Sequence, residues 1–188
     1  SAGSPVVRLQ QAGIDPVSLT DIIATHFHPD HISGIPILLM DMWLMGREEP
    51  LRGHGLDFTI DRLEKMMDLY EWQRWPGFFR VEYNRIPSQD MAVVIDAPDL
   101  CIRSTPVKHL LPTIGLRIEF HPEEKVAAYS CDTEPSPSVV RMAEGADVLI
   151  HEATGDSVGH TSPAQAGSVA SEAGARSLYL IHYVPPPK

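Results

Sequence analysis

Three histidines and one aspartate fall within six consecutive positions, from His26 to His31. A short apolar run with strand character, residues 21–24, precedes them, and a long apolar stretch begins at Ile35. A strand that ends in a loop of ligand-type side chains and continues into a helix is well suited to a metal centre. This stretch therefore predicts a strand–loop–helix unit built around bound metal.

The spacing within the stretch favours two ions over one. His26 and His28 are two residues apart, so in an extended segment their rings point to the same side and can bind one ion. Asp30 and His31 lie just past the turn and would more naturally reach a second ion. Four such groups crowd one ion but suit two ions about 3.5–4 Å apart. The alternative is a surface loop that is merely rich in histidine, and later residues argue against it.

The order His26-x-His28-x-Asp30-His31 resembles the H-x-H-x-D-H signature of the metallo-β-lactamase superfamily. From about Ser4 to Pro185 the sequence is most similar to the ribonuclease Z-like branch of these metal-dependent hydrolases. The resemblance implies an α/β (α+β) fold, the four-layer αββα sandwich, with the metals at one edge between the sheets. Residues 1–188 are expected to form a single hydrolase domain that is truncated at both ends relative to the family.

The rest of the chain reads as strands first, and then as strands that alternate with helices. This pattern suits sheets covered by helices. Residues 51–59 contain two glycines and His54, and we expect them to form a loop. Helices are expected over residues 5–12, 35–45, 60–72, 139–143 and 163–173, and strands within 78–120 and over 126–129, 147–150 and 177–181.

Four later polar residues each follow or end an expected strand: His109, Asp132, Glu152 and His182. Strand ends at one edge of a sheet converge in space, so residues far apart in the sequence can share a site there. Taken singly, a histidine of this kind is more often an ordinary surface or core residue. As a set that accompanies the His26–His31 motif, these residues favour a common site.

The resemblance implies seven ligands around two divalent ions. Zinc is the first expectation, and the same ligands also accept manganese or iron. Seven ligands that leave open positions for water fit a catalytic site better than a closed structural one. The implied ligands are His26, His28 and His109 for one ion, Asp30, His31 and His182 for the other, and Asp132 between the two.

The resemblance also implies a reaction, in which a hydroxide bridging the two ions attacks a phosphodiester and Asp30 helps to orient it. The segments 151–154 (His-Glu-Ala-Thr) and 159–162 (Gly-His-Thr-Ser) resemble a pair of motifs of that family. In those motifs a histidine donates a proton to the leaving group and a glutamate orients the histidine. Here these residues would be His160 and Glu152, with a loop histidine near a helix cap as the plainer interpretation of His160.

Two other functions stay open. One is hydrolysis of another ester class by the same fold: a thioester, a lactone, a sulfate ester or a cyclic nucleotide. The other is a metal-binding fragment without turnover that acts through a dimer surface at the aromatic cluster Trp72–Phe79. That cluster could equally be buried core or the wall of a substrate pocket. The sequence shows no Gly/Pro-rich basic arm of the kind that docks tRNA in ribonuclease Z, which leaves a small phosphodiester or RNA as the expected substrate.

The composition indicates which partners and which cellular compartment to expect for such an enzyme. The net charge of −10 disfavours a broad nucleic-acid surface, although bound metal would add positive charge at the site. Two cysteines, Cys101 and Cys131, give no disulfide framework, and no apolar run approaches the roughly 18 residues that cross a membrane. We therefore expect a cytoplasmic protein without membrane contact, and the family resemblance implies a homodimer.

Overall fold

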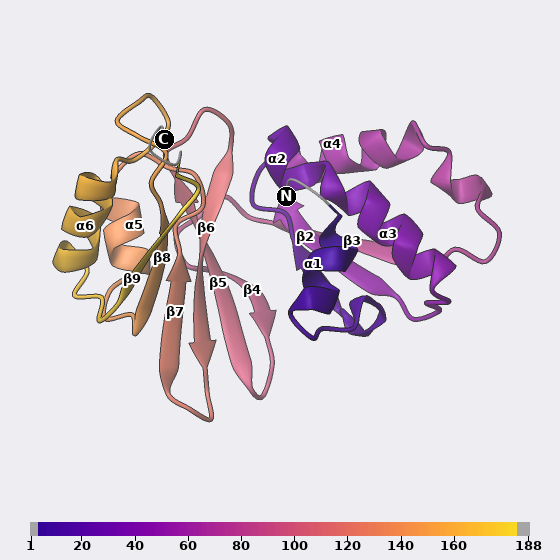
Figure 1. Ribbon diagram of the computed structural model, residues 1–188, viewed down its shortest axis with the longest axis horizontal. Helices are drawn as coiled ribbons and strands as arrows, with labels where there is room; N and C mark the ends of the chain where they lie inside the picture. Colours follow the sequence, from indigo (N-terminus) through magenta and orange to yellow (C-terminus); the bar gives the residue numbers. More distant parts are fainter. Residues whose placement is uncertain (1–3, 184–188) are drawn as a thin grey trace. The chain divides into compact units, whose positions relative to one another are not determined.

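The chain divides between Arg85 and Ile86 into two compact units, and each is described by itself (Figure 1). The computed structural model describes residues 4–183. The first unit contains a three-stranded sheet, and the second contains a six-stranded sheet. Helices pack on both sheets, so each unit consists of a sheet and a layer of helices.

The sheet of the first unit has the strand order β1-β2-β3, and β1 runs parallel to β2. Short 3-10 turns at Pro16–Ser18 and Trp72–Arg74 complete the connections. The helices and strands of this unit are α1 (Pro5–Gln11), β1 (Asp21–Ile23), α2 (Pro29–Ile32), α3 (Gly34–Leu44), β2 (Leu51–Leu56), α4 (Asp57–Asp68) and β3 (Val81–Ile86).

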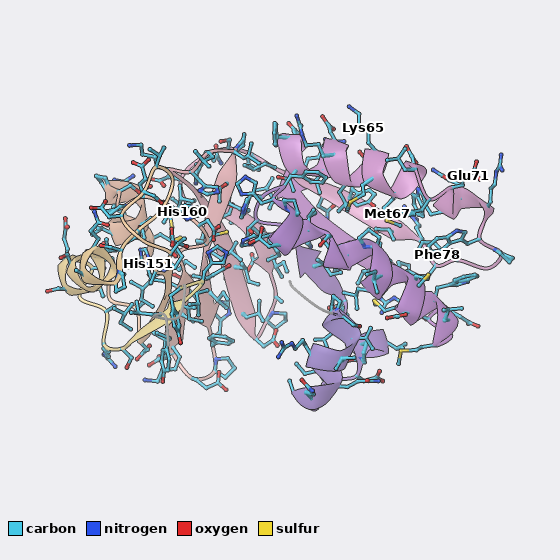
Figure 2. All side chains as sticks on the ribbon, turned by 45° about the horizontal axis from the view of Figure 1, so that its top comes forward. Lys65, Met67, Glu71, Phe78, His151 and His160 are labelled. Carbon is cyan, nitrogen blue, oxygen red and sulfur yellow. The ribbon has the colours of Figure 1, made fainter. Side chains whose placement is uncertain are left out.

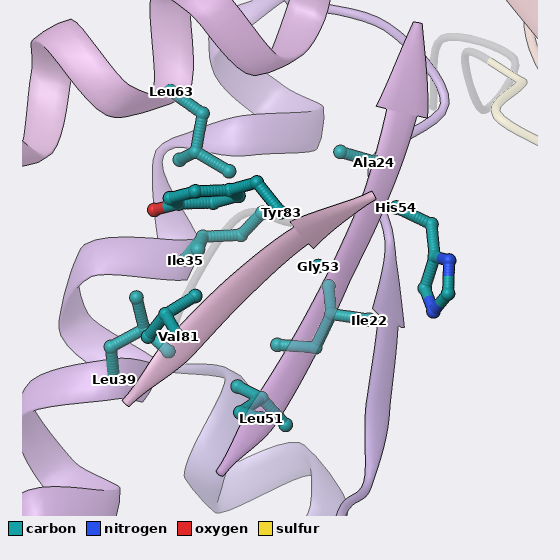
Figure 3. A pocket seen from close by; sticks show the side chains of 10 residues that line it. All are labelled: Ile22, Ala24, Ile35, Leu39, Leu51, Gly53, His54, Leu63, Val81 and Tyr83. Carbon is teal, nitrogen blue, oxygen red and sulfur yellow. The ribbon is translucent and has the colours of Figure 1, made fainter. Parts of the chain in front are cut away.

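Helices α3 and α4 cover one face of this sheet and close its core. Helix α4 is amphipathic, with Ile60, Leu63 and Met67 buried at helical spacing. Each such side chain contributes about 1.5–3 kcal/mol through its burial. Figure 3 shows the apolar side chains from the two helices and the three strands around a small cavity, with the ring of His54 pointing away from them. The opposite face of the sheet is therefore the polar one.

Four antiparallel strands open the second unit, and two parallel strands extend its sheet. Helices α5 and α6 connect β7 to β8 and β8 to β9, and they pack together on the same sheet (Figure 1). The elements are β4 (Ala92–Asp96), β5 (Leu100–Val107), β6 (Thr113–Phe120), β7 (Lys125–Tyr129), α5 (Pro137–Met142), β8 (Val148–Glu152), α6 (Pro163–Glu172) and β9 (Leu178–Ile181).

The core of the second unit lies between the sheet and these two helices. Val139 and Met142 of α5 are fully buried there together with Leu149 of β8. Gly115 of β6 lies directly beneath α5, where a Cβ atom would come within 2.8 Å of the Met142 sulfur. A side chain at this position would therefore force the buried Met142 side chain to move.

Most of the expected elements are confirmed, with ends shifted by a few residues. The helix expected over 60–72 begins at Asp57 and ends at Asp68, and the one expected over 139–143 is α5. The last helix begins with a capping box, in which the Ser162 hydroxyl accepts a hydrogen bond from the Gln165 backbone amide.

The loop expected over residues 51–59 is wrong. Residues 51–56 form strand β2, and α4 follows it at once. The two glycines serve packing here, because a Cβ atom on Gly53 would lie 3.2 Å from the Tyr83 ring and one on Gly55 would lie 3.0 Å from the Ala24 carbonyl. His54, expected to be a loop residue, is buried in the strand, with its Nε2 2.7 Å from Asp21 Oδ1.

The aromatic cluster packs largely against the core of the first unit. Phe79 is buried, and Trp72 and Phe78 are partly buried against the same core. Trp75 stacks on Trp43 of α3, with ring centroids 5.3 Å apart. This packing favours the core interpretation of the cluster over a free surface. Within residues 4–183, no helix has the length and apolar character needed to span a membrane.

Candidate metal centre and proton-donor pair

The His26–His31 motif occupies the connection between β1 and α3 in the first unit. Residues 24–28 leave the strand in an irregular stretch in which His28 has extended backbone angles, and Pro29 starts the single turn of α2. Asp30 and His31 lie in that turn. The strand–loop–helix arrangement predicted from the sequence is therefore confirmed in this unit.

The motif brings its ring nitrogens and its carboxylate together. Nε2 of His26 lies 3.1 Å from Nδ1 of His28, and the rings of His26 and His31 are 4.1 Å apart. The Nε2 atom of His31 lies 3.3 Å from Asp30 Oδ2. Two nitrogens bound to one tetrahedral zinc at about 2.0–2.1 Å would lie about 3.3–3.4 Å from each other. The His26–His28 separation fits a shared divalent ion.

The second unit gathers its candidate residues at the carboxyl ends of the parallel strands β7, β8 and β9. Asp132 follows β7, Glu152 ends β8 and His182 follows β9. Ligand atoms of Asp132, His160 and His182 all lie within 4.8 Å of one another. These residues are far apart in the sequence, and the shared strand edge places them together as expected.

His109, which follows β5, has a defined orientation. Its Nδ1 lies 2.7 Å from the carbonyl oxygen of Gly159. A carbonyl can only accept a hydrogen bond, so Nδ1 donates and the ring lone pair is on Nε2. Metal ligands of the histidine type commonly hold their second nitrogen in this way, which suits His109 to ligation through Nε2.

Glu152 is fully buried, and its carboxylate accepts hydrogen bonds from four groups. Three are backbone amides, that of Thr133 in the β7–α5 loop at 3.2 Å and those of Thr161 and Thr154 in the β8–α6 loop at 3.0 and 2.8 Å. The fourth is the Nδ1 of His160 at 3.1 Å. A buried carboxylate that is fully paired can fix the geometry of the loops around it.

His160 therefore donates from Nδ1 to Glu152. Its ring is 5.0 Å from that of His109 and stacks on that of His182 at 6.1 Å. The pairing of His160 with Glu152 inferred from the sequence is present in the second unit, where Figure 2 labels His160 and the neighbouring His151.

His151 has a different environment from His160. It is fully buried, its Nδ1 donates to the Glu152 carbonyl at 2.7 Å, and burial lowers the pKa of its imidazole. These features fit a structural role for His151.

Several residues that shape the site have no chemical signature in the sequence. The amides of Thr133, Thr154 and Thr161 act through the backbone, so their residue type does not reveal them. Cys131 precedes Asp132 at φ 54°, in the left-handed region that favours glycine. The family often has glycine there, and the backbone angle gives the physical reason.

Comparisons with known proteins identify the family of the chain. A model of the Beta-lactamase superfamily domain matches residues 4–183. The ribonuclease Z of Methanothermobacter thermautotrophicus is 29% identical over 93% of this chain and 73% of its own length. The ribonuclease Z of Pyrobaculum aerophilum is 32% identical over 93% of this chain and 71% of its own length.

Solved structures match the fold as well. The short form of human tRNase Z aligns with a TM-score of 0.78 at 22% identity, over 94% of this chain and 77% of the other. The metallo-beta-lactamase fold protein YhfI of Bacillus subtilis aligns with a TM-score of 0.75 at 24% identity, over 96% and 71%. The expected metallo-β-lactamase fold is thereby confirmed. The chain belongs to the metallo-β-lactamase superfamily and is a ribonuclease Z-like, metal-dependent hydrolase.

Proposed function

We propose that this protein is a phosphodiesterase that cleaves RNA with the help of two divalent metal ions. The observation that carries the proposal is the His160–Glu152 pair beside Asp132 and His182. Relatives that match over 93% of the chain are ribonuclease Z enzymes, which supports RNA as the substrate.

The residues that would hold the ions are those of the sequence motif and of the strand ends. When bound there, divalent ions supply a nucleophile at neutral pH and stabilise the negative charge that develops on the phosphate. Zinc as the resident ion, a cytoplasmic location and a homodimer remain predictions from the sequence. The ligands would be His26, His28, Asp30 and His31 from the first unit and His109, Asp132 and His182 from the second.

The protein's own part in bond cleavage is the delivery of a proton. The oxygen that leaves an RNA phosphodiester is a poor leaving group unless it is protonated. His160 donates from Nδ1 to Glu152, so in the protonated ring Nε2 is the atom that presents a proton to the leaving oxygen. Asp30 is proposed to orient the attacking nucleophile.

Glu152 prepares His160 for this step before substrate arrives. Its carboxylate is anchored by three backbone amides and therefore cannot follow the ring if the ring turns. The His160 ring is held in one orientation, so little reorganisation is needed at the moment of proton transfer.

The test compares two substrates that differ in leaving group. We expect His160→Ala to reduce kcat on a labelled RNA by about 10²–10⁴-fold, the usual contribution of a general acid. Bis(p-nitrophenyl) phosphate releases p-nitrophenolate, which needs little protonation, so its hydrolysis should fall much less. His121→Ala is the matched control, because His121 is an exposed histidine of the same unit.

Two results would contradict the proposal. Equal losses on both substrates, together with loss of bound metal, would make His160 a ligand and not the proton donor. Turnover of a thioester or lactone without turnover of any phosphodiester would assign the protein to another ester class.

A further inference from the structure

The hydroxyl of Thr154 contacts His182 at two places. Thr154 lies just after β8, and His182 lies just after β9. The Oγ1 atom of Thr154 is 2.8 Å from the His182 Nδ1 and 2.8 Å from the His182 carbonyl oxygen. One side chain thus contacts both the ring and the backbone of the same residue.

The two contacts together determine which ring nitrogen carries the proton. A hydroxyl has one hydrogen to donate, and a carbonyl oxygen can only accept. The Thr154 hydrogen therefore goes to the His182 carbonyl, and Oγ1 must accept at its contact with Nδ1. Nδ1 of the neutral ring then bears the hydrogen, and the lone pair is on Nε2.

The same contacts also fix the direction of the ring. His182 has φ 53°, a left-handed conformation that residues with a side chain adopt rarely. Thr154 holds the carbonyl of this residue and its ring at once. The ring is therefore defined relative to the end of β8 as well as to β9.

Thr154 is itself anchored to the proton-donor pair. Its backbone amide donates to Glu152 Oε2 at 2.8 Å, while the other carboxylate oxygen accepts from His160. His109 achieves its orientation through the Gly159 carbonyl, which no substitution can remove. For His182 the group at hydrogen-bond distance from Nδ1 is the Thr154 side chain, whereas Asp132 Oδ1 lies 3.7 Å from the same atom, so the role of Thr154 can be tested directly.

We propose that Thr154 is a positioning residue that sets the tautomer and direction of the His182 ring, so that Nε2 presents its lone pair to a divalent cation. The inference rests on the metal centre of the proposed function. It adds a hydroxyl that does not touch the ion and acts through His182.

The first measurement is the tautomer of His182 in metal-free protein. Nitrogen NMR of ¹⁵N-histidine-labelled protein distinguishes the two tautomers at about pH 8, where ordinary imidazoles are neutral. We expect the Nδ1–H form in the wild type and in Thr154→Ser, which keeps the hydroxyl. Thr154→Val keeps the shape of the side chain and lacks the acceptor. In this variant we expect the Nδ1–H tautomer of His182 to be no longer the main form.

The second measurement is zinc affinity by competition with a chromogenic chelator. Removal of a group that orients a ligand histidine typically weakens metal binding about 10–100-fold, and we expect this for the weaker site of Thr154→Val. Thr154→Ser should bind zinc nearly as tightly as the wild type. Thr59→Val is the matched control, because the buried Thr59 hydroxyl has no hydrogen-bond partner among the described residues.

The outcomes separate this inference from the proposed function. A wild-type His182 in the Nε2–H form, or a Thr154→Val protein with unchanged tautomer and affinity, would overturn the role of Thr154. Circular dichroism shows whether the Thr154→Val protein folds. If it does not fold, Thr154→Ser still tests the inference, because the inference requires that the serine protein bind zinc as tightly as the wild type. If the wild type binds no zinc, the proposed metal centre is wrong. The tautomer of the His182 ring then still tests the role of Thr154.

Discussion

Replacement of Glu152 by glutamine tests whether a buried anion organises the second unit. Three of its four donors, including His160, meet Oε1, and only the Thr154 amide meets Oε2. Glutamine offers one acceptor oxygen and one NH2 group. The better orientation keeps the oxygen at the Oε1 position, so the NH2 group faces the N–H of Thr154.

The expected cost follows from this arrangement. The partly buried Thr154 amide becomes a donor without an acceptor, which costs about 1–3 kcal/mol. The other three hydrogen bonds change from a charged to a neutral acceptor, at about 1 kcal/mol each. We therefore expect Glu152→Gln to lower the free energy of unfolding by about 4–6 kcal/mol, a large part of the roughly 5–15 kcal/mol that holds most proteins folded.

The assay is urea unfolding of metal-free protein, so that ion binding does not contribute to stability. In a thermal scan the same loss would lower Tm by on the order of 10–20 °C for a chain of this size. Glu172→Gln is the control, because Glu172 is an exposed residue at the end of α6 in the same unit. A Glu152→Gln protein within about 1 kcal/mol of the wild type would refute the idea that a carboxylate anion holds these loops.

Two further predictions concern the first unit. Hydrogen bonds from Arg52, followed by that from His54, hold the pKa of the Asp21 carboxyl well below its usual range. A depressed pKa stabilises the fold above the unfolded value of about 3.9, so Asp21→Asn should lower the urea midpoint at pH 7, by an amount that shrinks as the pH falls below about 4. Arg47 is buried and donates to three backbone carbonyls, so Arg47→Met should cost about 3–5 kcal/mol in the same assay, whereas the exposed Arg80→Met should cost little. An unchanged midpoint in either Asp21→Asn or Arg47→Met would contradict the corresponding argument.

Sequence reasoning worked best where a signal is local. The amphipathic pattern predicted α4 to within a few residues. The cap of α6 is also a local signal, because its two residues, Ser162 and Gln165, are three positions apart.

Sequence reasoning failed where a contact between residues far apart in the chain determines the structure. The glycines of β2 suggest a loop, but they are needed because Tyr83 and the Ala24 carbonyl approach the strand closely. The pairing of His160 with Glu152 could be inferred from a family pattern, whereas the three amides that hold Glu152 could not. Those amides come from two loops, β7–α5 and β8–α6, and no residue type marks a backbone donor.

The two units differ in how far their candidate ligands are spread along the chain, and this sets how each tolerates insertions and deletions. In the first unit the ligand groups fall within residues 26–31, so a length change elsewhere moves them as one piece. In the second unit they extend from residue 109 to residue 182 and depend on strand register. A single residue gained or lost inside β8 or β9 turns every later side chain of that strand to the other face of the sheet. Natural variation in chain length should therefore collect in the loops of the second unit and spare its parallel strands.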